Sequence, residues 1–120
     1  MAAGAKDPAR MLANAGAIAR LIRHEGIDIV HARSRAPAWP ALVAARRTGA
    51  RFVTTYHGAY NQPNRAKALY NSVMARGDRV IANSAYTARL IATRHPWCAD
   101  RIVTIRDGRV AEDRRPEPRA

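Results

Sequence analysis

Two histidines and one asparagine occupy the positions in this sequence that are best suited to chemistry. His57, with Gly58 after it, ends a β-branched and aromatic run. His31 ends a short apolar run, and Asn83 directly follows another. An imidazole titrates near neutral pH and can bind or transfer a proton, while an amide can bind a hydroxyl group. These three residues define a candidate site, provided that the fold brings them together.

The elements that must position them form a regular series. Short apolar runs predict strands at 27–32, 51–56, 78–82 and 101–105, and each interval has room for one crossover helix. This pattern predicts an α/β fold, a partial Rossmann-like parallel sheet of four strands with helices on both faces. Ligands bind beyond the carboxyl ends of such strands, so residues 31, 57 and 83 are expected to share one rim.

The ends of the helices also have sequence signals. Asp7, followed by Pro8, is a suitable N-cap for the first helix, which Gly26 would end. A helix of about 65–76 carries apolar residues at helical spacing, and Gly77 would close it. Ser84 is a natural N-cap for the last helix.

Composition sets the limits of the fold. With 120 residues the chain is long enough for one domain, which we place at 1–105. Residues 106–120 contain two prolines and Val110 as the one large apolar residue, which predicts a disordered basic tail. A sustained apolar segment is absent, which argues against a secretory signal or a membrane span and predicts a cytoplasmic location.

The net charge of +12 suggests an anionic partner. The arginines are spread over many elements, which argues against nucleic acid and leaves a phosphate or an anionic membrane surface as the partner. Arg65, Lys67 and Arg76 lie outside the apolar stripe of their helix, either as a solvated face or facing lipid headgroups. Cys98 is the only cysteine, so we expect a packed or half-exposed thiol, no disulfide and no metal site.

Four motifs carry a family resemblance when they are taken together: IDIVHARSRAPAW, FVTTYHGAYN, YNSVMARGDRVIANS and WCADRIVTI. In this order and at this spacing they resemble the second half of the N-terminal domain of a family 4 glycosyltransferase with the GT-B fold. The likeness runs from about Asp7 to Ile105 and is strongest to bacterial members that act on cell-surface polysaccharide and lipopolysaccharide core.

The resemblance implies transfer of a sugar from a nucleotide-sugar to a glycan or glycolipid acceptor, with retention of configuration and without a metal or cofactor. It assigns His57 to catalysis. The candidate substrate-binding residues are His31, Ser34, Arg35, Gly58, Tyr60, Asn61, Asn83 and Ser84. Each also has a structural alternative, because a histidine can stabilise a strand end, Ser84 can serve only as an N-cap, and Tyr60 with Asn61 can shape a turn.

The sequence departs from the family pattern in three places. The glycine-rich loop and the donor-binding domain of the family have no counterpart here, and Arg106-Asp107-Gly108 stands where the family has a proline-containing bridge. We therefore expect a fragment that is inactive alone, located in the cytoplasm or at the inner membrane. The strand near Asp28 would expose a sheet edge that favours self-association.

Two other classes of function stay open at this point. The first is a non-enzymatic module that binds anionic or sugar ligands through Arg33, Arg35 and His57. The second is a basic protein that binds nucleic acid, whose affinity would fall steeply with salt.

Overall fold

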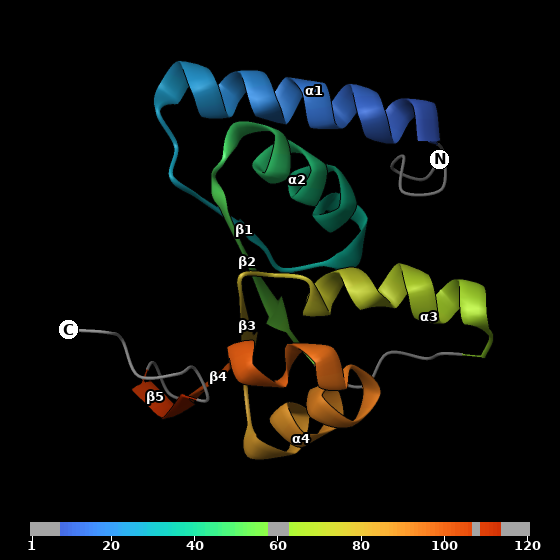
Figure 1. Cartoon of the computed structure of the whole chain (residues 1–120), viewed down its shortest axis with the longest axis vertical. Coiled ribbons are helices and arrows are strands. Elements are labelled where there is room, and N and C mark those ends of the chain that lie inside the picture. The colour runs from blue at the N-terminus through green and yellow to red at the C-terminus, as the bar shows by residue number, and fades with distance from the viewer. Residues whose placement is uncertain (1–7, 58–62, 107–108, 114–120) are drawn as a thin grey trace.

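In the computed structural model, helices alternate with strands from α1 to β4, and a fifth strand follows β4 directly (Figure 1). The structure describes residues 8–57, 63–106 and 109–113. The elements are α1 (Pro8–Glu25), β1 (Ile29–Ala32), α2 (Arg35–Thr48), β2 (Arg51–Tyr56), α3 (Arg65–Asn71), the 3₁₀ helix η2 (Ser72–Ala75), β3 (Arg79–Ala82), α4 (Ala85–Arg94), the 3₁₀ helix η3 (Pro96–Arg101), β4 (Ile102–Arg106) and β5 (Arg109–Asp113).

The strands form a single sheet in the order β1-β2-β3-β4-β5. The first four are parallel, with Ala32 opposite Thr54 and Tyr56 opposite Ala82. The predicted four-stranded parallel sheet with flanking helices is therefore confirmed. Because β1 ends the sheet, the edge that we predicted near Asp28 is present among the described residues.

The core lies between the sheet and the helices α2, η2 and α4. Phe52 and Tyr56 of β2 are fully buried, as are Val80 and Ala82 of β3. They pack with Ala38, Ala41, Leu42, Ala45, Met74, Ala88 and Ile91 in one apolar cluster. The helix α1 packs outside α2, where Ala19 and Ile22 meet Ala44. The alternation of buried and partly exposed residues along β2 shows that one face of the sheet receives this cover.

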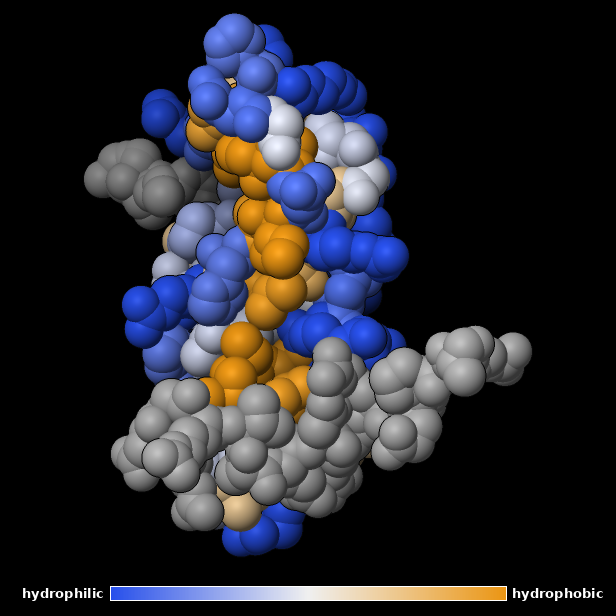
Figure 2. All heavy atoms as spheres, turned by 90° about the vertical axis from the view of Figure 1, so that its left-hand side faces the viewer, coloured by the Kyte–Doolittle hydropathy of each residue, from blue (hydrophilic) through white to orange (hydrophobic). Residues whose placement is uncertain are grey.

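The second face of the sheet is different. Figure 1 shows α2, α3 and α4 on the same side of the strands, and the opposite side is the one that Figure 2 presents to the viewer. The strand order runs in one direction, so successive right-handed crossovers place their helices on the same face. The sequence also predicts helices on this second face, but none of the described helices lies there.

The third helix is shorter than the predicted 65–76. It is α-helical to Asn71 and continues as the 3₁₀ helix η2 to Ala75. The Ser72 hydroxyl donates to the carbonyl of Leu69 at 2.6 Å, and Asn71 is fully buried with its side chain bound to another helix. Side-chain bonds of this kind compete with the α-helical ladder and tighten the last turn.

The predicted disordered tail is wrong for residues 109–113. The strand β4 extends to Arg106, and β5 pairs with it antiparallel, with Arg109 opposite Arg106. Counting apolar side chains missed this strand because its pairing rests on backbone hydrogen bonds to the edge of β4. The dipeptide Asp107-Gly108 was the available signal, since Asp-Gly between two strands is typical of a hairpin.

Gly77 allows an unusually close backbone approach. The segment after η2 lies against β2, where the Asp78 amide donates to the Phe52 carbonyl at 2.6 Å and the Asp78 carboxylate accepts from the Phe52 amide at 2.9 Å. A Cβ atom at residue 77 would lie 2.5 Å from the Arg79 carbonyl oxygen and 3.0 Å from the Thr54 nitrogen. The glycine is needed for this contact, whereas Gly26 and Gly49 have the positive φ angles expected at helix ends.

Gly77→Ala should therefore destabilise the fold by about 1–3 kcal/mol, because the added methyl forces two strands apart. Gly16→Ala is the matched control. Its Cβ would meet only an Arg20 guanidinium nitrogen at 3.9 Å within α1, so it should stabilise by about 0.5–1 kcal/mol. Urea unfolding followed by circular dichroism measures both, and equal stability of the two variants would contradict the close approach.

Candidate functional site

The carboxyl ends of β1, β2 and β3 meet at one rim of the sheet, as the sequence predicts. His57 follows β2 and Asn83 follows β3, and both side chains are exposed. The Asn83 amide donates to the His57 carbonyl at 3.3 Å, which ties the two strand ends together. His57 is thereby held by its backbone while its imidazole stays open to solvent.

His31 joins this rim from β1. Its Nε2 lies 2.6 Å from the Thr55 hydroxyl of β2, on the face away from the helices. Burial lowers the pKa of His31, and the neighbouring Arg33 and His57 lower it further. A lowered pKa keeps the imidazole neutral at pH 7, so His31 can donate with one nitrogen and accept with the other.

Two helices begin at the same rim, and each has a serine at its N-cap position. Ser84 caps α4 by accepting from the Thr87 amide at 3.1 Å, so the predicted N-cap is confirmed. Ser34 precedes α2, is exposed, and makes no side-chain capping bond, so its hydroxyl is available to a ligand. The N-termini of α2 and α4 add backbone N–H groups that favour negative charge at the rim.

The sequence predicts that Arg35 lies at the rim, but its side chain turns toward α3 instead. Its guanidinium donates to the buried Asn71 side chain at 2.6 Å and lies 5.6 Å from the centre of the Tyr70 ring. Trp39, one turn later in α2, donates its indole N–H to the Tyr70 carbonyl at 3.1 Å. Arg35 therefore joins α2 to α3, which weakens the hypothesis of a binding module that depends on this arginine.

Three of the candidate residues, Gly58, Tyr60 and Asn61, lie outside the described residues. Thr55 was missed by the sequence analysis, although strand alternation could have found it. His31 and Thr55 point to the same face because His31 is opposite Val53, two residues before Thr55. The rim therefore consists of His31, Thr55, His57 and Asn83, with the Ser34 hydroxyl beside them.

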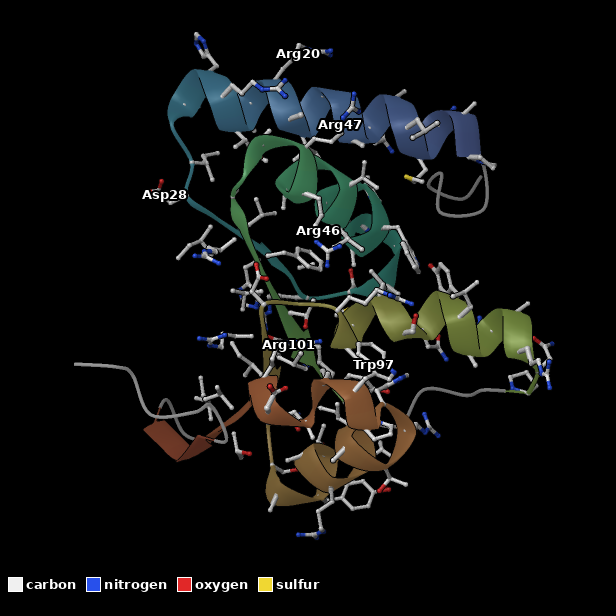
Figure 3. All side chains as sticks on the ribbon, viewed as in Figure 1. Arg20, Asp28, Arg46, Arg47, Trp97 and Arg101 are labelled. Carbon is white, nitrogen blue, oxygen red and sulfur yellow. The ribbon has the colours of Figure 1, made fainter. Side chains whose placement is uncertain are left out.

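A second group of interactions holds the helices below the rim. The Arg76 guanidinium lies 5.8 Å from the Trp39 ring and 5.4 Å from the Trp97 ring. The Arg101 guanidinium lies 5.8 Å from the centre of the Trp97 ring and donates to the Gly77 carbonyl at 3.1 Å. Arg101 and Trp97 are labelled in Figure 3. These cations satisfy backbone carbonyls and aromatic faces inside the protein, so they are not free for an external anion.

His95 and Cys98, on either side of Trp97 in the sequence, are also buried. Burial lowers the pKa of His95, and Arg94 and Arg76 lower it further. The Nε2 of His95 has no hydrogen-bond partner among the described residues. Burial raises the pKa of Cys98 to about 11. Of the two states that the sequence leaves open, packed or half-exposed, the structure shows the packed thiol.

The described residues offer neither a metal site nor a membrane span. They contain no group of three or more His, Cys, Asp or Glu side chains that is arranged to hold a metal ion. None of the helices in that part of the chain is both long and apolar enough to span a membrane.

Comparison with known proteins assigns the family. The model of glycosyltransferase family 4 matches residues 2–111. The chain belongs to glycosyltransferase family 4. A solved structure of a glycosyltransferase from Rickettsia africae ESF-5 is similar at 42% sequence identity and a TM-score of 0.72. This chain covers 28% of that protein, and 88% of this chain is matched. Among curated proteins, the search found no match.

For this family 4 chain, Arg35→Ala should cost about 1.5–3 kcal/mol of stability, because it leaves the buried Asn71 side chain without its charged donor. Arg33→Ala, at an exposed position two residues earlier, should change stability by less than about 0.5 kcal/mol. Urea denaturation tests the difference. If Arg35→Ala unfolds at the same midpoint as Arg33→Ala, the proposed tie between α2 and α3 is wrong.

The stability of the chain should fall as the pH drops below about 6.5, the ordinary pKa of histidine. His95 has a lowered pKa in the folded state, so the unfolded chain takes up its proton first. The stabilisation is complete above pH 6.5 and is lost as the pH falls through the folded pKa. His95→Gln should reduce the loss in urea midpoint between pH 7.5 and 5.0, whereas His24→Gln, at an exposed position, should leave it unchanged. An identical pH dependence in all three proteins would refute this assignment.

Proposed function

We propose that this chain is the acceptor-side part of a retaining glycosyltransferase, which transfers a sugar from a nucleotide-sugar to a glycan or glycolipid of the bacterial cell envelope. Membership of glycosyltransferase family 4 supports sugar transfer in general. The observation that carries the assignment of the site is the bond that links His57 and Asn83 across two strand ends.

His57 is the proposed acid/base residue beside the transferred sugar. Its imidazole is exposed at the rim, while its carbonyl is fixed by Asn83, so the ring can be presented to a ligand in a constrained place. His31, held neutral and bonded to Thr55, is suited to binding an acceptor hydroxyl. The free Ser34 hydroxyl and the Asn83 amide extend this row of hydroxyl-binding groups.

The donor diphosphate requires a larger concentration of positive charge than this rim supplies, because negative charge develops on the leaving group. The described rim has the N-termini of α2 and α4 and exposed Arg33, while Arg35 is bound to Asn71. We propose that the diphosphate is bound by polypeptide corresponding to the part of the Rickettsia africae protein that this chain does not cover. The isolated chain should then release no nucleotide from a nucleotide-sugar.

The proposed site of action is the inner face of the membrane. Leu69 is 59% exposed on α3, next to Arg65 and Lys67, and Tyr70 lies beneath the Lys67 ammonium at 5.4 Å. An apolar side chain among cations and an aromatic ring is the composition that binds anionic headgroups. This placement would bring a glycolipid acceptor close to the rim.

A chimera tests the proposed catalytic role. Residues 8–106 replace the matched segment of the Rickettsia africae glycosyltransferase, and nucleotide release is followed with a panel of UDP-, GDP- and ADP-sugars and a cell-envelope glycolipid extract. His57→Ala should lower kcat at least about 100-fold, as expected for loss of a general acid or base. His24→Ala, at a histidine that is exposed on α1, is the control and should leave kcat unchanged.

Unchanged kcat in the His57→Ala chimera would exclude the catalytic role. The anomeric configuration of the product, read by NMR, tests retention separately, and an inverted product would overturn that part of the proposal.

A further inference from the structure

The face of the sheet opposite the helices carries a continuous apolar band. Strand pairing and alternation place apolar side chains from all four parallel strands on this face: Ile29, Val53, Ile81, Val103 opposite Ile81, and Ile105 two residues further along β4. Ile29 is 61% exposed, Val53, Ile81 and Ile105 are half-buried, and Val103 is buried. Figure 2 shows this band running across the molecule with hydrophilic side chains on both sides. Parallel sheets are almost always covered on both faces, so this surface is suited to a partner.

The band is bordered by cations. Arg51 and Arg79 are exposed and, with Ile29, Val53 and Asp78, line a hollow of about 330 Å³ on this face. The Arg51 guanidinium makes no hydrogen bond or ion pair with the described residues, although the Arg51 amide donates to the Asp28 carbonyl at 2.8 Å. The Arg79 guanidinium uses one nitrogen to donate to the Asp78 carbonyl at 2.7 Å. The Asp78 carboxylate accepts from the Phe52 amide, and no ion pair joins either guanidinium to Asp28, which Figure 3 labels. Both guanidiniums can therefore bind carboxylates of a partner.

We propose that this face binds an amphipathic α-helix whose apolar stripe is flanked by Asp or Glu residues. Four strands at a spacing of about 4.8 Å make the band about 14 Å long, which is the length of about ten helical residues. One large apolar side chain of the helix would enter the hollow beside Val53, and flanking carboxylates would pair with Arg51 and Arg79. This inference does not rest on the proposed function.

Two other occupants fit the surface less well. A second copy of this chain would bring two surfaces of the same positive sign together, which opposes association. A membrane needs apolar side chains that protrude, whereas Val53 and Ile81 are half-buried within the sheet. An acidic amphipathic helix avoids both objections. It carries the opposite charge, and it extends its own side chains into the hollow. The solved glycosyltransferase, of which this chain covers 28%, has further polypeptide that could supply one.

A pair of synthetic peptides tests the proposal with the full chain. Both are 18-residue helices with leucines on one face; one has glutamates beside the leucines and the other has lysines. Fluorescence anisotropy should give at least ten-fold tighter binding of the glutamate peptide. Val53→Glu should abolish its binding, and the double variant Arg51→Glu with Arg79→Glu should reverse the preference so that the lysine peptide binds more tightly. Leu12→Glu, at an exposed residue of α1, should change nothing.

Control measurements distinguish binding of a helix from binding of a second copy or of lipid. Circular dichroism of each variant confirms that the fold is intact, and the charge reversal keeps the test decisive even if Val53→Glu unfolds. Equal binding of both peptides, or binding that the charge reversal leaves unchanged, would overturn the proposal. A Val53-dependent dimer in sedimentation, or Val53-dependent binding to phosphatidylglycerol vesicles without peptide discrimination, would assign the face to a second copy or to lipid instead.

Discussion

The parallel pairing of β1, β2 and β3 is the constraint on which the rest of the structure depends. Each strand is short, and β2 makes backbone bonds to neighbours on both sides. Since all three run in the same direction, everything that follows a strand emerges at one rim, and the rim is where His57 and Asn83 are joined. A single antiparallel strand among the three would have placed one of these residues at the far end of the sheet.

The same pairing order also decides which surfaces are covered. Successive strands are added in one direction, so α2, α3 and α4 lie on one face and bury Phe52, Tyr56 and Val80. That face supplies most of the apolar burial that stabilises the fold. The opposite face keeps a half-buried apolar band bordered by arginines, which is unusual for a parallel sheet and makes it the clearest surface for a partner.

Part of the excess positive charge belongs to arginines that bind other groups of this protein. Arg35 binds a buried asparagine, Arg76 lies between two tryptophans, and Arg101 donates to backbone carbonyls. A guanidinium is suited to these roles because it is planar, has five donors and loses its hydration more easily than an ammonium group. The charge that remains for external partners lies at exposed positions such as Arg33, Arg51 and Arg79. Net charge alone therefore overstates the size of any anion-binding surface.

The sequence by itself determined the strand and helix series, the helix-ending Gly26, the N-cap at Ser84 and the shared rim of residues 31, 57 and 83. These features follow from local rules, because apolar periodicity, backbone conformation and capping depend on neighbouring residues. Tertiary structure alone decided that Arg35 turns to Asn71, that His31 bonds Thr55, and that Gly77 is required by contact with β2. It also decided that residues 109–113 pair with β4 and that one sheet face stays open. Each of these depends on groups far apart in the chain, whose meeting is fixed by strand order and packing.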